Sequence, residues 1–330
     1  MTPTPLSRLE AWPRQPLASL PTPLVGAANL ARALGPDSPS VCVKMDAETG
    51  FGLGGNKVRK LEFELGTDRL AGITHLVTTG GPQSNHCRIT AAAAAHLGLG
   101  CVLVINGQAP AEPRGNALLQ RLFGAEIRTV VARSDRAPAM AAAAEEIRSG
   151  GGCALVIPLG ASTPLGSLGY ALGAVELARQ LDRLPAADGT WMFVSASSCG
   201  TLAGLLLGVS LLERDDIRLV GVSADVPAAE MRSEAVRLAA EGGGLLGWEG
   251  RVLADALSCD DTQVGPGYGI ATPEAEEAIR IFGRSEGIVL DPVYTGKAAA
   301  GLLAWIREGR VPSAHRTVFV HTGGHPALLA

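Results

Sequence analysis

The stretch Gly50-Phe-Gly-Leu-Gly-Gly-Asn-Lys-Val-Arg-Lys-Leu-Glu62 joins an apolar run, residues 41–44, to a helical pattern that begins at Lys57. Four glycines precede the lysine, and their backbone freedom lets a bulky ligand approach the main chain closely. An amine at the positive end of a helix is easier to deprotonate than a free amine. Only four of the 28 basic residues are lysine, so each lysine is a candidate for chemistry. Lys57 is therefore the candidate reactive group.

Apolar runs of strand length alternate with helical patterns along most of the chain, which predicts parallel sheets with crossover helices. A breaker-rich loop at 158–166 separates a first series from a second. We therefore expect an α/β protein of two parallel-sheet domains with helices on both faces, and a ligand beyond the carboxyl ends of the strands. The predicted strands are 41–44, 75–79, 101–105, 126–131, 154–157, 192–195, 219–223, 288–290 and 317–321, and the predicted helices are 27–34, 116–123, 137–147, 166–181, 273–287, 296–309 and those that begin at 57, 84, 200 and 228.

Composition excludes several classes of partner. The 330 residues have a formal net charge of -4, a pI near 5.9 and a mean hydropathy of +0.22. These values indicate a globular chain without a basic surface, so we expect no nucleic acid and no anionic membrane as a partner. No apolar run approaches the roughly 20 residues of a membrane span, and the first residues lack the apolar segment of a signal peptide. The expected compartment is the cytoplasm.

The cysteines and histidines suggest no metal site. Six cysteines are widely scattered without a C-x-x-C pair, and six histidines form no H-E-x-x-H motif. We expect reduced cysteines and no metal.

A second motif, Gly80-Gly-Pro-Gln-Ser-Asn-His86, joins a predicted strand to a predicted helix. Free N–H groups and the positive end of the helix dipole would face an anion there, and a substrate carboxylate is the expected ligand. The alternative is that Ser84 only caps the helix.

A third motif, Ser197-Ser-Cys-Gly-Thr201, also opens a helix after a strand. Small residues let successive N–H groups converge on a phosphate, while hydroxyl groups donate further bonds. The motif lacks Gly-Lys-Ser/Thr, so a nucleotide P-loop is not indicated. The alternative is a helix capped by Ser198.

Two of the three tyrosines, Tyr268 and Tyr294, lie in segments rich in glycine and proline. A phenol in such a place can transfer or steer a proton. Tyr170 lies in an apolar helical pattern and is expected in the core.

Together these motifs resemble the pyridoxal-phosphate (PLP) enzymes of the D-cysteine desulfhydrase and 1-aminocyclopropane-1-carboxylate (ACC) deaminase family, over essentially the whole chain. In that family the Schiff-base lysine follows Gly-Gly-Asn, which assigns the role to Lys57 and places Asn56 beside the cofactor. The resemblance implies PLP fold type II, the tryptophan synthase β-like fold, and a homodimer. It also implies a larger PLP-binding domain, residues 1–57 and 164–330, with a smaller α/β domain, 58–163, inserted into it.

The resemblance also implies roles for single residues. Ser84 lies near the substrate, Asn85 lies beside the ring oxygen of the cofactor, and Thr322 borders the cofactor ring. Thr295 stands where ACC deaminases carry glutamate; an uncharged hydroxyl bonds the pyridine nitrogen without imposing its protonation, which favours loss of a β-substituent over ring opening. The residues that bind the phosphate are Ser197, Ser198, Cys199, Gly200 and Thr201. Tyr268 and Tyr294 match active-site tyrosines of the family. The chain departs from the family pattern at Met45, Pro82, Cys87 and His325.

The expected activity is therefore a PLP-dependent lyase for a small amino acid, in which Lys57 holds the cofactor and takes the α-proton. With D-cysteine the products would be hydrogen sulfide, pyruvate and ammonia. L-cysteate, 3-chloroalanine or ACC are alternative substrates. Two other classes stay open from the residues alone: a PLP-binding protein without turnover, and a nicotinamide oxidoreductase. The latter would rest on the G-x-G-x-x-G spacing of Gly50, Gly52 and Gly55, which lacks the acidic residue expected about 20 positions later.

Overall fold

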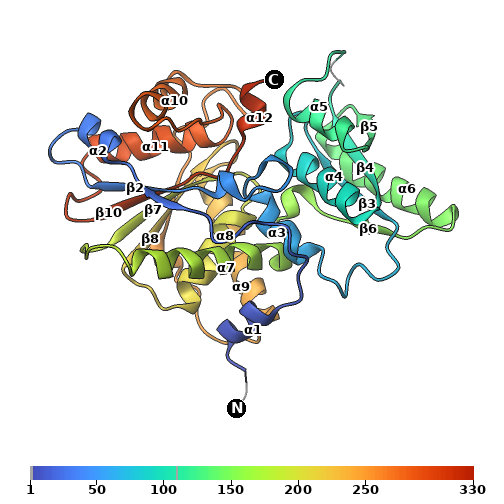
Figure 1. Cartoon of the computed structure of the whole chain (residues 1–330), viewed down its shortest axis with the longest axis horizontal. Helices are drawn as coiled ribbons and strands as arrows, with labels where there is room; N and C mark the ends of the chain where they lie inside the picture. The colour runs from blue at the N-terminus through green and yellow to red at the C-terminus, as the bar shows by residue number, and fades with distance from the viewer. Residues whose placement is uncertain (1–2, 109–110) are drawn as a thin grey trace.

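The structure is a computed structural model that describes residues 3–108 and 111–330. These residues form a six-stranded sheet and a four-stranded sheet, each with its own helices, and the two assemblies lie next to each other along the longest axis (Figure 1). The chain starts in the larger sheet, crosses to the smaller one and then returns.

The larger sheet has the strand order β1-β2-β10-β7-β8-β9. All of its pairs are parallel except the first, in which β1 runs antiparallel to β2. Its central strands are almost wholly buried, as expected for parallel strands with helices on both faces. The strands are β1 (Leu24–Gly26), β2 (Ser40–Lys44), β10 (Arg316–Val320), β7 (Thr190–Ala196), β8 (Ile217–Ser223) and β9 (Leu257–Asp260).

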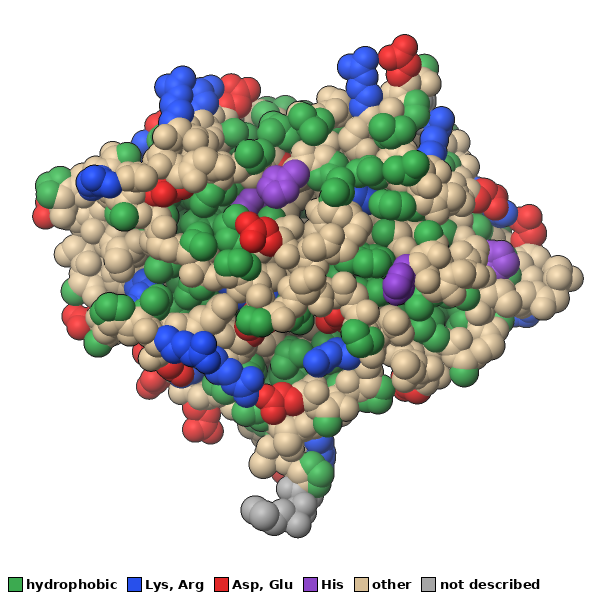
Figure 2. Space-filling view, in the orientation of Figure 1, with side chains coloured by type: hydrophobic (Ala, Val, Ile, Leu, Met, Phe, Trp, Pro, Cys, Tyr) green, Lys and Arg blue, Asp and Glu red, His purple; other side chains and the backbone are tan. Residues whose placement is uncertain are grey.

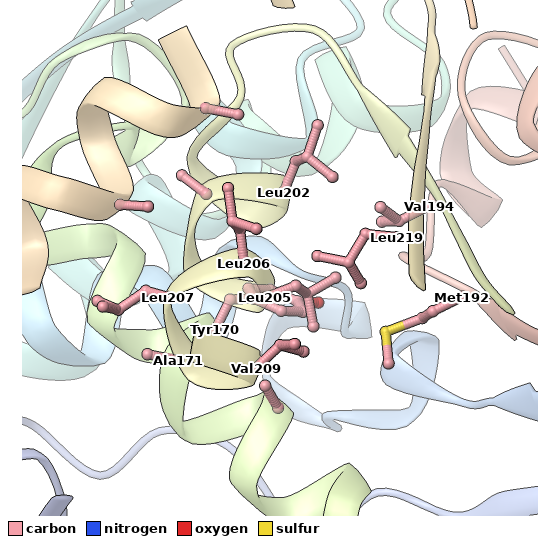
Figure 3. Close-up of a cluster of buried hydrophobic side chains, with 14 of the residues drawn as sticks. Tyr170, Ala171, Met192, Val194, Leu202, Leu205, Leu206, Leu207, Val209 and Leu219 are labelled. Atoms are coloured by element: carbon pink, nitrogen blue, oxygen red, sulfur yellow. The ribbon is translucent and has the colours of Figure 1, made fainter. Parts of the chain in front are cut away.

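Two apolar clusters bury the faces of this sheet. On one face α7 (Pro164–Leu181), α8 (Gly200–Leu211) and α9 (Ala228–Leu245) pack over the sheet, and Figure 3 shows Leu202 and Leu205 of α8 on the side of the helix that faces strand residues such as Met192 and Leu219. The other face is covered by α2 (Ala28–Leu34), α10 (Pro273–Glu286) and α11 (Thr295–Arg307). Because α8 is apolar on all sides, it forms the centre of its layer.

The smaller sheet is fully parallel, in the order β5-β4-β3-β6. One face packs against α4 (Asn85–Leu97), beside which lies α5 (Gly115–Leu122), and the other packs against α6 (Arg136–Ser149). Its strands are β3 (His75–Gly80), β4 (Gly100–Asn106), β5 (Glu126–Val130) and β6 (Ala154–Val156).

Helix α3 (Lys57–Glu64) lies between the two assemblies (Figure 1). Its Val58 and Leu61 belong to the core that includes α4, while Phe63 belongs to the core that includes α7. The reactive lysine therefore starts a helix that is held by both halves of the molecule.

The predicted strand at 288–290 is wrong. Ile288 and Leu290 are buried, but the segment joins no sheet, and the carbonyl of Val289 instead accepts hydrogen bonds from histidine side chains. Short elements were missed because they carry too few residues for a periodic pattern. They are α1 (Pro5–Ala11), β1, β9, α12 (His325–Leu328) and the 3-10 turns η1 (Asp46–Glu48), η2 (Phe51–Leu53), η3 (Arg133–Asp135), η4 (Leu159–Ala161) and η5 (Ala254–Ala256).

No helix within the described residues has both the length and the hydrophobicity that a membrane crossing requires. Positive and negative side chains are interspersed on the face shown in Figure 2, without a broad area of one sign. All six cysteines are free thiols, and the described residues contain no group of three or more acidic, histidine or cysteine side chains arranged for a metal ion.

Candidate active site

The glycine loop before Lys57 needs its glycines for steric reasons. Gly54 has φ +68°, and a Cβ there would lie 1.9 Å from the carbonyl oxygen of Ala47. Gly55 has φ +110°, and its Cβ would lie 3.0 Å from Thr322 O. A side chain at either position would push the loop away from its neighbours. The loop is thus fixed in place directly before Lys57.

Lys57 faces a cavity that is lined by residues from both halves of the molecule and contains about 870 Å³ of space, part of it open to solvent. Because loops at the carboxyl ends of both sheets contribute, the cavity lies where parallel-sheet proteins bind ligands. Of the residues proposed from the sequence, the cavity brings together Asn56, Lys57, Ser84, Asn85, Ser197, Ser198, Cys199, Gly200, Thr201, Tyr268, Tyr294 and Thr322.

Burial lowers the pKa of Lys57 from 10.5 to about 8. The sequence argument expected a lowered pKa from the helix dipole; in the structure, removal of the amine from water lowers it. Lys60, one helical turn later, also lines the cavity, and burial together with the positive charge of Lys57 lowers its pKa well below 10.5. Lys57 and Lys60 are neighbouring amines without a full counter-charge among the described residues. Because an anion would stabilise their protonated forms, this part of the cavity suits an anion.

The other two lysines are used elsewhere. Lys44 is buried and forms an ion pair with Glu176. Lys297 donates hydrogen bonds to the carbonyl oxygens of Val264, at 2.8 Å, and Gly267, at 3.0 Å. Only Lys57 and Lys60 among the four lysines therefore line the cavity.

A cluster of polar groups surrounds the start of α8. Lys60 Nζ donates to Ser162 Oγ at 2.9 Å, and Ser162 Oγ lies 2.8 Å from Ser198 Oγ. A Cβ on Gly200 would lie 2.7 Å from Ser162 Oγ and 2.9 Å from Lys60 Nζ, so glycine keeps this cradle open. Helix N–H groups, hydroxyls and an ammonium group together suit a phosphate.

Ser198 does not cap α8, which removes that alternative. The capping position is Cys199, at φ +60°, and no side chain caps the helix. The N–H of Gly200 instead donates to Ser162 Oγ at 3.2 Å, so the hydroxyl that accepts from the start of α8 comes from a distant loop. Asn56 Nδ2 donates to Thr201 Oγ1 at 2.9 Å, which couples the lysine loop to the start of α8.

Ser84 does cap α4, as the alternative interpretation allowed. Its Oγ accepts from Cys87 N at 3.2 Å, yet Ser84 also lines the cavity. Asn85 Oδ1 accepts from Asn116 Nδ2 at 2.9 Å, so α5 fixes the orientation of the Asn85 amide. Capping and ligand binding are therefore compatible at this helix start.

Tyr268 and Tyr294 share a hydrogen bond between their hydroxyl groups, and their ring centroids lie 5.9 Å apart at 70°. Burial raises the pKa of both phenols, and the neighbouring Tyr268 contributes further to the increase at Tyr294. Both are therefore protonated at neutral pH. Tyr170, by contrast, is buried in the core and donates to Asp46 Oδ2 at 2.5 Å.

Thr295 is not brought to the cavity. It is fully buried as the first residue of α11, its Oγ1 donates to Asp291 Oδ1 at 2.7 Å, and it accepts from Asp291 N at 2.8 Å. These bonds commit the hydroxyl to the turn before α11, so the geometry does not support its placement against a cofactor ring. Thr322 and Ser195, whose hydroxyl oxygens are 3.1 Å apart, line the cavity instead.

The departures from the family pattern also lie outside the cavity lining. Met45 packs beside the core that includes α2 and α11, and burial raises the pKa of the Cys87 thiol to about 12. His325 Nε2 lies 3.2 Å from His321 Nε2 and 3.1 Å from Val289 O. Pro82 accepts a bond from Gln120. These four positions therefore give no direct contact that would select the substrate.

Sequence reasoning missed several residues that line the cavity or support it. Lys60 had a signal, because lysine is rare in this chain, but Ser162 and Ser195 are ordinary serines in loops and strands. Arginine supplies nearly all cations of the chain, so the type of residue alone did not single out any arginine. The missed residues are Lys60, His86, Arg133, Arg136, Ser162, Ser195 and Asp225.

An amine with a lowered pKa shares one cavity with an ammonium-and-hydroxyl phosphate cradle at a helix start. This combination defines the class of enzymes that hold a phosphorylated aldehyde cofactor on a lysine. Residues 16–323 match the family described as "Pyridoxal-phosphate dependent enzyme". The chain belongs to this family of PLP-dependent enzymes.

Known relatives support this membership. D-cysteine desulfhydrases of Salmonella paratyphi B and Salmonella newport are each 38% identical over 331 residues, which covers 99% of this chain and 98% of the relative. A solved structure described as an ACC deaminase homologue superimposes with a TM-score of 0.88 at 36% identity and covers 100% of this chain and 97% of its own. The resemblance inferred from the motifs is confirmed.

A more distant structure shares the fold alone. Threonine deaminase isoform 2 from Solanum lycopersicum has a TM-score of 0.67 at 15% identity, covering 97% of this chain and 83% of its own. Together with the family match, this likeness confirms the expected fold class, an α/β protein of PLP fold type II.

Proposed function

We propose that this chain is a PLP-dependent lyase that removes a β-substituent from a small amino acid, in the manner of a D-cysteine desulfhydrase. With D-cysteine the products are pyruvate, ammonia and hydrogen sulfide. The relatives of that name support the substrate, since they align over nearly the whole chain. The proposal is carried by one observation: Lys57, with its lowered pKa, shares a cavity with the cluster of Lys60 and Ser198.

The start of α8 fits the phosphate of PLP. The cradle that a Cβ on Gly200 would fill is bordered by Lys60 Nζ, which supplies a positive charge. When bound, the cofactor draws electrons from the Cα of the amino acid and so makes the α-proton removable. The residues that would hold the phosphate are Ser197, Ser198, Cys199, Gly200, Thr201 and Lys60.

Lys57 is the residue that would hold the cofactor and act as the base. Its pKa of about 8 leaves part of the amine neutral near neutral pH, and a neutral amine accepts the proton from Cα. Asn56 keeps the lysine loop in place, because its N–H donates to Thr322 O at 2.9 Å and its amide donates to Thr201.

The substrate side of the cavity is assigned to Ser84, Asn85, Tyr268 and Tyr294. The first turn of α4, at Ser84, offers N–H groups to the carboxylate of the substrate. Asn85, whose amide is oriented by Asn116, would hold the ring oxygen of the cofactor. The two phenols share a hydrogen bond, so one of them keeps a free hydroxyl proton, and that phenol donates to the departing group.

Thr322 is our candidate for the partner of the cofactor ring, in place of Thr295. Its side chain lines the cavity, whereas the hydroxyl of Thr295 is bonded to Asp291. A hydroxyl partner does not impose protonation on the ring nitrogen. That property favours departure of a β-substituent, which carries its electrons away, over opening of the ACC ring.

The alternatives within this reaction type are L-cysteate or another β-substituted alanine, and ACC. The neighbour described as an ACC deaminase homologue is the reason to retain ACC. The nicotinamide interpretation is not retained, because the family match indicates PLP and because η2, which contains Gly52, interrupts the strand-to-helix turn.

We further propose the domain division 1–57 with 164–330 and 58–163, a homodimer, and the cytoplasm as compartment. The division is supported by the path of the chain. Strands β1 and β2 of the larger sheet come before α3, strands β3 to β6 form the smaller sheet, and the chain rejoins the larger sheet at β7, after α7. The dimer rests on the family resemblance, and the compartment is the expectation drawn in the sequence analysis.

The test is product formation from D- and L-cysteine, D- and L-cysteate, 3-chloroalanine and ACC. We expect D-cysteine to yield pyruvate and sulfide in equal amounts, and Lys57→Ala to yield neither. Cys153→Ser, a change at an exposed thiol, is the matched control and should retain full activity. Faster turnover of ACC than of every β-substituted amino acid, or no turnover at all, would refute the proposal.

A further inference from the structure

Two arginines line the substrate side of the cavity and have no assigned role. Arg133 is the first residue of η3 and Arg136 the first residue of α6, both shortly after β5. The carboxyl end of a parallel strand is where such sheets present ligand-binding groups. Both arginines therefore line the cavity from the side of the smaller sheet.

Arg133 reaches across to the larger sheet. Its guanidinium carbon lies 5.2 Å from the centre of the Tyr268 ring, and its Nη1 lies 3.7 Å from Asp225 Oδ2. The Arg133 side chain is 59% exposed, so it lies at the mouth of the cavity. Asp225 neutralises at most one of the two arginines.

Arg136 is half-buried and lacks a counter-charge. It donates to the side-chain oxygen of Asn106 at the end of β4, while its Nε is buried without any hydrogen-bond partner among the described residues. It also forms no ion pair within residues 3–108 and 111–330. Burial and the nearby charge of Arg133 lower the pKa of Arg136, as expected for two cations that await an anion.

The phosphate of PLP is not that anion. It is assigned to the start of α8, where Lys60, Ser162 and Ser198 gather. Arg133, in contrast, packs on Tyr268, whose hydroxyl is bonded to Tyr294. The α-carboxylate of the substrate is assigned to the start of α4. A guanidinium group next to the tyrosines therefore faces the remaining part of the substrate, its β-substituent.

We propose that Arg133 and Arg136 bind the β-substituent and select amino acids in which it is an oxyanion, such as a sulfonate or a sulfate ester. This inference rests on the proposed β-elimination. Guanidinium groups suit such oxygens because they donate several charge-assisted hydrogen bonds in a planar arrangement. A neutral β-substituent forms no charge-assisted hydrogen bond with either arginine, so the arginines do not strengthen its binding.

The reaction balances with cysteate as substrate. The base removes the α-proton, the electrons of the Cα–H bond form the Cα=Cβ bond, and the Cβ–S bond breaks with its electron pair on sulfite. The released 2-aminoacrylate takes up one water and gives pyruvate and ammonia. No oxidant or reductant is needed, and the arginines hold the anion that departs.

The test compares kcat/KM for cysteate and for 3-chloroalanine, each as D and L forms, in the enzyme with PLP. Arg136→Gln should lower the value for cysteate by about 10- to 100-fold, the range expected for lost hydrogen bonds to a charged group. The value for 3-chloroalanine should change by less than about threefold, because its neutral substituent makes no charge-assisted hydrogen bond that the substitution could remove. Arg136→Lys, which keeps the charge, should recover part of the loss.

Arg148→Gln is the matched control, because Arg148 lies on the same helix, is exposed and pairs with Glu145 on the surface. It should leave both substrates unaffected. If Arg136→Gln lowers both substrates equally, the arginine binds the α-carboxylate and the proposal is overturned. An unchanged ratio in the Arg133→Gln, Arg136→Gln double variant also overturns it.

Binding separates this inference from the proposed function. If no substrate is turned over, the β-elimination is refuted, but calorimetric titration of cysteate and of alanine into the PLP-loaded Lys57→Ala protein still decides the role of the arginines. Cysteate should bind at least about tenfold more weakly after Arg136→Gln is added, and alanine should not. Equal affinities for cysteate with and without Arg136 would overturn the inference.

Discussion

Replacing Lys57 by methionine should stabilise the protein without cofactor, because Lys57 is a cation kept in a place that disfavours its charge. Burial lowers its pKa from 10.5 to about 8. At about 1.4 kcal/mol for each pH unit, this fall corresponds to about 3 kcal/mol of destabilisation below pH 8. The side chain borders an open cavity, so water screens part of this effect, and we expect a gain of about 1 to 3 kcal/mol at pH 7.

The gain should depend on pH in a defined direction. Between about pH 8 and 10.5 the unfolded protein binds a proton at Lys57 that the folded protein has released, so the stability of the natural protein rises with pH. The advantage of Lys57→Met is therefore complete below pH 8 and disappears as the pH approaches 10.5. Methionine is close to lysine in length, so packing changes little.

The measurement is urea unfolding of both cofactor-free proteins at several pH values from 7 to about 10.5, followed by far-ultraviolet circular dichroism. Most other groups that titrate in this range are common to both proteins and cancel in the difference; Lys60 is the exception, because the charge of Lys57 lowers its pKa. Arg148→Met, at an exposed position on α6, is the control and should give a difference that is independent of pH. A Lys57→Met protein that is no more stable than the natural one at pH 7, or an advantage that persists at pH 10.5, would refute the reasoning.

Three further outcomes follow from the site. Borohydride reduction and peptide mapping should find the pyridoxyl group on Lys57; a label on Lys60 would contradict the assignment. Thr201→Asp sets a negative charge against the phosphate and should weaken PLP retention by at least about tenfold in equilibrium dialysis; unchanged retention would move the phosphate elsewhere. Thr295→Glu places a second carboxylate against buried Asp291 and should lower the free energy of unfolding by about 3 kcal/mol or more, unlike Thr295→Ser; a stable Glu variant with an altered preference for ACC would return Thr295 to the cofactor.

Much of the architecture could be predicted from local pattern. The buried strands β7 and β8 and helices such as α7 have strong periodic signals, because their side chains must match the layer that covers them. The lysine loop was also predictable, since Gly54 and Gly55 adopt backbone angles that other residues resist. Both signals are local, so they are visible in one sequence.

The remaining features depend on partners far away in the chain. An apolar run such as 288–290 becomes a strand only if a sheet edge is free beside it, and here the larger sheet ends at β1 and β9. Thr295 directly follows Tyr294, yet only the tyrosine reaches the cavity, because the threonine hydroxyl bonds Asp291. Arg133 packs on Tyr268 through a contact between distant segments, which no spacing in the sequence encodes.

Arg59, two residues after Lys57, helps to hold α3 in place although the same helix carries two lysines that line the cavity. Burial lowers the pKa of Arg59, but the carboxylates of Asp46 and Glu176 outweigh that effect and raise it. Arg59 Nη2 lies 2.9 Å from an oxygen of each of them. The helix is thus anchored by Arg59, whose positive charge is neutralised by two carboxylates. Lys57 and Lys60, on the first turn, have no carboxylate partner of this kind in the described part of the chain. Because Arg59 does not line the cavity, its ion pairs hold α3 without using Lys57 or Lys60, and both of those amines line the cavity instead.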